Sequence, residues 1–97
     1  MGELEQWRVF RCPDGAELIC ELRAGSGTLR VTSPIAQFAL ALRSLVTASG
    51  RRYELIGPAG QGAALLTMMR ELIVAREQGG CDDVTAEYQA RMVAATH

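Results

Sequence analysis

A Pro-Asp-Gly turn between two strand-like segments constrains the fold of this chain more than any other feature. The segments span residues 7–12 and 16–23, and both are rich in the apolar and aromatic residues typical of strands. The turn at 13–15 suits a type I turn followed by a left-handed glycine, which makes a three-residue hairpin loop with a bulge. We therefore predict an antiparallel hairpin in which Cys12 pairs with Ala16.

The predicted register continues outward along both strands and divides the hairpin into two faces. It pairs Arg11 with Glu17, Phe10 with Leu18, Val9 with Ile19, and Arg8 with Cys20. One face is apolar and is expected to be core, and it holds Phe10, Cys12, Leu18, Cys20 and Leu22. The opposite face is mixed, and it holds Trp7, Val9, Arg11, Glu17, Ile19, Glu21 and Arg23.

Five further elements are expected along the rest of the chain. A third strand should span 28–32 and a fourth 51–56. A helix is predicted over 34–48, because a Ser-Pro pair precedes apolar residues at helical spacing. A second helix is predicted over 63–78, with a buried stripe made by Leu65, Met69, Leu72 and Ile73. A third is predicted within 81–97.

This order, β-β-β-α-β-α-α, predicts an α+β fold. We expect a two-layer sandwich, with a mainly antiparallel four-stranded sheet and helices on one face. Residues 1–6 should be a flexible N-terminal segment, and residues 7–80 a single domain. Residues 81–97 should be a C-terminal helix that is loosely docked or frayed, since its apolar stripe is thin.

Composition narrows the possible partners and location. The chain has 97 residues and a net charge of −1, so no strong overall field draws it to nucleic acid or to an anionic membrane. No apolar stretch approaches the ~20 residues that span a bilayer, and the N-terminus lacks the pattern of a signal peptide. A cytoplasmic protein is expected. All ten basic residues are arginine, a bias typical of GC-rich genomes and mobile elements.

The sequence contains no assembled catalytic, metal or cofactor motif, and we expect a protein that is not an enzyme. The single histidine, His97, is the last residue, so a histidine-based triad has no ordered base. The three cysteines have no C-x2-C spacing for zinc. The glycine-rich loop 57–62 precedes a helix but lacks both the P-loop and the dinucleotide patterns, which favours a plain connector.

All three cysteines are expected to be reduced. In the predicted register Cys20 lies opposite Arg8, four residues along the strand from Cys12. Four residues of strand span ~13 Å, whereas a disulfide needs Cα atoms within ~7 Å.

These observations lead to a functional hypothesis centred on the mixed face. If the helices cover only the apolar face, the mixed face stays partly exposed and forms a partner-binding patch from Trp7, Val9, Arg11, Ile19, Glu21, Arg23 and Arg30. The expected partner is another protein, most simply a second copy in a homodimer. Two alternatives stay open. The first is a nucleic-acid-associated regulator using the sheet arginines Arg8, Arg11, Arg23 and Arg30 together with Arg51-Arg52, and the second is an anion or small-molecule sensor using the loop 57–62. Nucleic acid is less favoured, because cross-strand pairing with glutamates explains the same arginines. The alternative to an exposed mixed face is that the segment around Leu4, or the last helix, covers this face within the same chain.

Overall fold

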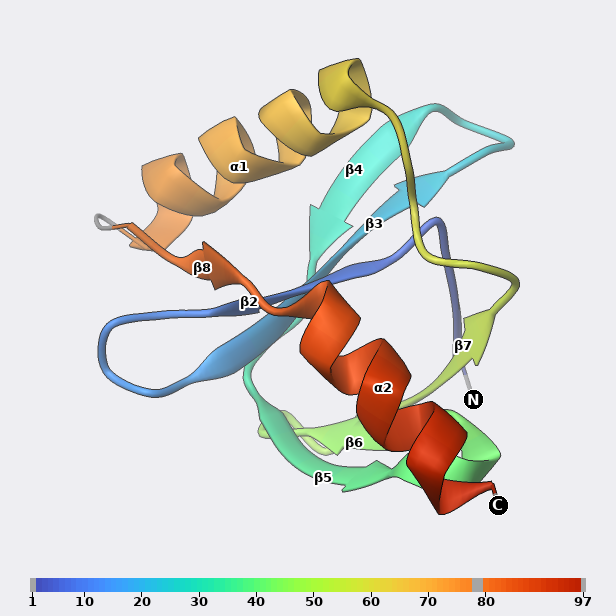
Figure 1. Cartoon of the computed structure of the whole chain (residues 1–97). Helices are drawn as coiled ribbons and strands as arrows, with labels where there is room; N and C mark the ends of the chain where they lie inside the picture. The colour runs from blue at the N-terminus through green and yellow to red at the C-terminus, as the bar shows by residue number, and fades with distance from the viewer. Residues whose placement is uncertain (1, 78–79, 97) are drawn as a thin grey trace.

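The computed structural model describes residues 2–77 and 80–96, and it shows an α+β fold with two sheets of four strands each (Figure 1). The strands lie in the orders β1-β7-β6-β5 and β4-β3-β2-β8. All neighbouring strands are antiparallel except β1 and β7, which are parallel. The α+β class and the mainly antiparallel pairing are confirmed, but the structure has two sheets where one was expected.

In chain order the elements are β1 (Gly2–Glu5), β2 (Arg8–Arg11), β3 (Glu17–Arg23), β4 (Thr28–Val31), β5 (Ile35–Ala39), the 3₁₀ helix η1 (Leu40–Leu42), β6 (Ser44–Thr47), β7 (Arg52–Ile56), α1 (Ala63–Glu77), β8 (Asp82–Asp83) and α2 (Thr85–Ala95).

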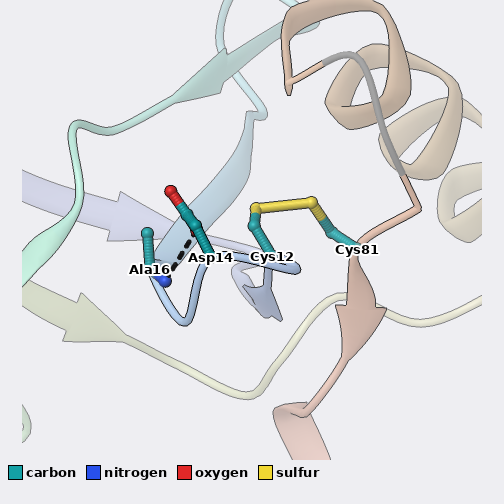
Figure 2. Close-up of a disulfide and its surroundings, with 4 residues drawn as sticks. All are labelled: Cys12, Asp14, Ala16 and Cys81. Carbon is teal, nitrogen blue, oxygen red and sulfur yellow. Dashed lines mark hydrogen bonds between the residues drawn. A yellow bond between two sulfur atoms is a disulfide. The ribbon is translucent and has the colours of Figure 1, made fainter.

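The predicted hairpin is confirmed in geometry and in register. Gly15 has φ 89°, and the N–H of Cys12 donates to the carbonyl oxygen of Ala16 at 2.8 Å. The carboxylate of Asp14 accepts a hydrogen bond from the N–H of Ala16 at 2.9 Å, which holds the turn closed (Figure 2). The ladder of β2 and β3 pairs Arg11 with Glu17, Phe10 with Leu18, Val9 with Ile19 and Arg8 with Cys20, as the turn chemistry predicts.

The helix predicted over 34–48 is wrong. This segment forms β5, η1 and β6, and β6 pairs with both β5 and β7. Its apolar residues fit a helical spacing, but a short run of them fits a buried strand equally well. Arg43 ends η1 in the left-handed region at φ 53°, which breaks any continuous helix. Leu42 therefore lies 73% exposed instead of in a core.

The apolar face of the hairpin packs as predicted. The helix α1 covers it with the stripe read from the sequence, bringing Leu65, Met69 and Ile73 against Phe10 and Leu18. The expected helix end at Gln78 lies outside the described residues. The strands expected over 28–32 and 51–56 are present as β4 and β7.

The mixed face of the hairpin is buried, which corrects the expectation that it is exposed. Trp7 is 1% exposed, and Val9 and Ile19 are 0% exposed. They form one core with residues of the other sheet, such as Leu45 and Leu55, and with residues of α2. The two helices consequently lie on opposite sides of β2 and β3 (Figure 1).

Both chain ends contribute to this covering layer. Gly2–Glu5 form β1 beside β7, and Leu4 is buried, so the expectation of a flexible segment over residues 1–6 is wrong. The expected C-terminal helix is present as α2, but it is not loosely docked, since Tyr88 and Met92 are buried in the same core. The alternative in which the chain covers its own mixed face is the one found.

A disulfide joins Cys12 to Cys81, so the expectation of three reduced thiols is wrong for this pair (Figure 2). The strand β8 pairs with β2, with Arg11 opposite Asp82, and the next pair along the ladder is Cys12 and Cys81. Their Cα atoms lie 4.1 Å apart. Cys20 is a buried free cysteine, as expected, and makes no bridge to Cys12.

Candidate functional site

The seven residues expected to bind a partner do not share one exposed surface. Trp7, Val9 and Ile19 lie in the core between the sheets. Arg11 lies at the turn end of the hairpin, whereas Arg23 lies at the far end of β3. Arg11 bonds to Glu17 beside it in the hairpin at 2.8 Å and to Glu87 of α2 at 2.9 Å. These bonds, first to Glu87 and then to Glu17, hold the pKa of the Arg11 guanidinium above its ordinary value. Arg11 is therefore part of a partly exposed ion-pair network within the chain.

Glu21 organises the remaining members of the expected patch. Its side chain is 1% exposed, and one carboxylate oxygen accepts the N–H of Glu5 at 3.2 Å. The other oxygen faces the guanidinium groups of Arg23 at 3.4 Å and of Arg30 at 3.9 Å. A buried carboxylate requires such partners, because an ion removed from water without compensation is costly.

Arg8, a nucleic-acid candidate from the sequence, is used inside the fold. It donates to Asp83 at 2.7 Å and to the carbonyl oxygen of Gly60 at 2.8 Å. The pKa of the Asp83 carboxyl is lower than its ordinary value. Burial by itself would raise this pKa, but the hydrogen bonds from Arg8 and Thr85 lower it by more. This pair ties β8 to β2 and is structural.

One surface hollow combines apolar walls with a cation, at the place where η1, the loop after β7 and α2 meet. The hollow measures about 210 Å³, and we name it the Trp7–Arg43 pocket. Its lining consists of Trp7, Arg43, Pro58, Ala59, Gln89, Met92 and Val93. The loop and the two helical elements come from distant parts of the sequence, so only the tertiary fold assembles this pocket.

Arg43 covers the buried tryptophan in an unusual conformation. Its guanidinium carbon lies 5.8 Å from the centre of the Trp7 ring, within range of a cation–π interaction. Its Nη2 donates to the carbonyl oxygen of Gly57, which also accepts the indole N–H at 3.3 Å. The Arg43 Nε is buried and has no hydrogen-bond partner among the described residues. A left-handed non-glycine residue with an unsatisfied donor is a costly arrangement, and such residues cluster at functional sites.

One exposed apolar side chain lines the Trp7–Arg43 pocket, and another is the chain neighbour of Arg43. Leu42 precedes Arg43 and is 73% exposed, and Val93 lines the pocket from α2 and is 58% exposed. Across the described residues only Met68 and Val74, both on α1, are comparably exposed large apolar residues. The sequence does not reveal this site, because the apolar pattern of residues 34–48 predicts a helix that would contain Leu42 and Arg43, and nothing nearby signals a left-handed arginine.

A second hollow, of about 430 Å³, gathers four arginines at one end of the two sheets. We name it the four-arginine hollow, and its arginines are Arg23, Arg30, Arg51 and Arg52. Arg51 and Arg52 come from the turn and strand after Gly50, which has φ 85°. The sequence analysis had named all four as nucleic-acid candidates, and the fold brings these four together while it sends Arg8 and Arg11 elsewhere.

The loop 57–62 acts as a connector with its backbone groups engaged inside the fold. The carbonyl oxygens of Gly57 and Gly60 accept side-chain donors, and the N–H of Gly60 donates to the carbonyl oxygen of Trp7 at 3.1 Å. A side chain at position 60 would collide with the backbone of Gln6, at 2.8 Å, so this close approach requires glycine.

Neither a metal site nor a known relative gives a more specific assignment. Within residues 2–77 and 80–96, no group of three or more His, Cys, Asp or Glu side chains could hold a metal ion. No helix in the same ranges is long and apolar enough to cross a membrane. Comparison of the chain with protein-family models, with curated proteins and with solved structures finds no match.

Proposed function

We propose that this chain is a non-enzymatic module that binds another protein, and that its contact surface is the Trp7–Arg43 pocket with Leu42 and Val93. The observation that carries the proposal is the juxtaposition of two exposed apolar side chains with a strained arginine stacked over a tryptophan. Arginine is enriched at the energetic centres of protein interfaces, and Arg43 is partly exposed above the buried Trp7. This surface takes the place of the sheet face that the sequence suggested.

The pocket indicates what part of a partner would enter it. A hollow of about 210 Å³ is smaller than the ~300–1,000 Å³ typical of small-molecule sites, so it suits a single side chain. The apolar walls favour an aliphatic residue, and the guanidinium favours an adjacent carbonyl or carboxylate oxygen. Covering Leu42 and Val93 would contribute about 2–4 kcal/mol from apolar burial.

The chain supplies a matched control for a test of this surface. Val93→Asp changes an exposed position that lines the pocket, and Val74→Asp makes the same change at a similarly exposed position on α1. A photo-crosslinking residue at position 42 should trap a partner in the wild-type background and in the Val74→Asp variant. It should fail when Val93→Asp is added. Equal crosslinking in all backgrounds, or none in the wild type, would refute the proposal.

The same experiment identifies the partner. A crosslinked product of twice the chain mass would indicate a homodimer, and sedimentation would then show concentration-dependent association. The expected cytoplasmic location remains a proposal, and the Cys12–Cys81 disulfide weighs against it, because structural disulfides are rare in the cytosol. Blocking free thiols before the cells are opened, followed by mass spectrometry, shows whether the bridge exists in the cell, and a reduced pair would support the cytoplasmic proposal.

A further inference from the structure

The four-arginine hollow lies apart from the surface proposed above and carries an unbalanced positive charge. Arg23 and Arg30 share the single carboxylate of Glu21. In the part of the chain that the structure describes, Arg51 and Arg52 make no salt bridge. Four positive charges against one negative charge leave three positive charges around the hollow.

The fold positions two of these arginine side chains and the backbone of a third before any ligand arrives. The buried Glu21 fixes the guanidinium groups of Arg23 and Arg30 on β3 and β4. On the other sheet, the N–H of Thr47 donates to the carbonyl oxygen of Arg51 at 2.9 Å, and the N–H of Gly50 donates to the carbonyl oxygen of Thr47 at 2.9 Å. This tight turn sets the direction of the chain at Arg51, and fixed donors lose less entropy on binding.

The backbone requires glycine at two positions that line the hollow. Gly2 and Gly50 line it together with the arginines and Tyr53. A side chain at position 2 would lie 2.9 Å from the Tyr53 ring, and one at position 50 would be strained at φ 85°. The volume of about 430 Å³ falls within the ~300–1,000 Å³ range of small-ligand sites.

Neighbouring acidic residues limit the size of an anionic ligand. Arg23 also lines a third hollow, which adjoins the four-arginine hollow and whose other lining residues include Glu3, Glu5 and Glu54. A nucleic-acid strand extending beyond Arg23 would bring its phosphates against these carboxylates, which is unfavourable. A compact anion that stays among the arginines avoids them.

We propose that the four-arginine hollow binds a compact ligand with about three negative charges on phosphate or carboxylate oxygens. The planar guanidinium group presents paired N–H donors that match either oxyanion. This inference does not depend on the protein-binding surface, because the two sites share no residue.

Titration calorimetry with inorganic pyrophosphate and with citrate, at constant ionic strength, tests the inference. The wild type should bind at least one of the two, and preference between them identifies the oxyanion. Arg51→Gln and Arg52→Gln should each weaken binding by about tenfold, as expected when a charge-assisted contact is lost. Arg70→Gln on α1 removes the same charge elsewhere and should leave binding within about twofold.

Three results would overturn the inference. The first is no binding of pyrophosphate or citrate by folded wild type. The second is equal binding by wild type and both turn variants. The third is tighter binding of a short single-stranded DNA than of pyrophosphate under the same conditions, which would assign the arginines to nucleic acid. Thermal unfolding of each variant shows whether a loss of binding reflects a loss of the fold.

Discussion

Removing the Cys12–Cys81 disulfide should cost a large share of the stability that a chain of this size possesses. The bridge joins residues 69 positions apart, and closing such a loop in the unfolded chain is worth about 4 kcal/mol in the chain-entropy model. Domains of this class have only about 5–15 kcal/mol in total. We therefore expect Cys81→Ser to lower the free energy of unfolding by about 4 kcal/mol.

Urea unfolding followed by tryptophan fluorescence measures this loss. Trp7 is the only tryptophan and is buried, so its emission reports global unfolding. With a slope of about 1–2 kcal/mol per molar urea, the midpoint should fall by about 2–4 M. Reducing the wild type should produce a similar shift, and the Cys81→Ser protein should not respond to reductant.

Alkylation provides the independent check. Folded, unreduced protein should retain only Cys20 as a free thiol, and that thiol should react slowly. Burial, followed by the nearby charge of Glu21, raises its pKa to about 11, so little thiolate is present at neutral pH. Rapid labelling of three thiols in the folded protein, or a urea midpoint unchanged by reductant, would refute the disulfide and the β2–β8 register that places it.

Three further predictions concern packing and charge. Calorimetry should show that Trp7→Ala lowers the free energy of unfolding by about 3–5 kcal/mol and Leu42→Ala by less than about 0.5 kcal/mol. Similar losses in the two variants would mean that Leu42 is packed. Tyr88→Phe should cost about 1 kcal/mol, because the hydroxyl donates to Glu17 at 2.6 Å; an unchanged urea midpoint would dismiss that bond. Asp83 has a lowered pKa, so its contribution to stability is present above the unfolded value of ~3.9 and is lost as the pH falls through the folded value. Asp83→Asn should reduce the loss of melting temperature as the pH falls into the acid range. The same pH dependence in the variant and the wild type would contradict this contribution of Asp83.

The local sequence was sufficient wherever neighbouring residues decide the structure. The Pro-Asp-Gly turn fixed the hairpin register, since few turn types accept that order of residues. The stripe of α1 was also predictable, because its apolar residues repeat over more than two turns and cover one apolar face of the hairpin. The sequence marks Arg23, Arg30, Arg51 and Arg52 as candidates for binding nucleic acid, but it does not predict that they lie around one hollow.

Residues 34–48 show why periodicity alone failed elsewhere. Their apolar pattern is compatible with a helix and with two short strands, and the choice depends on β7, which offers a partner edge to β6. Once β6 pairs there, Arg43 turns the chain in the left-handed region, and the Trp7–Arg43 pocket forms around it. No nearby residue announces that conformation.

The sequence by itself determined the α+β class, the hairpin and its two faces, and the helix that covers the apolar face. Only the tertiary structure decided what covers the mixed face, which cysteines meet, and which arginines share a hollow. These outcomes depend on contacts between residues far apart in the chain, such as Cys12 with Cys81 and β1 with β7. Such contacts form because a face carrying Trp7, Val9 and Ile19 is too apolar to leave in water, and the chain ends supply the surface that buries it.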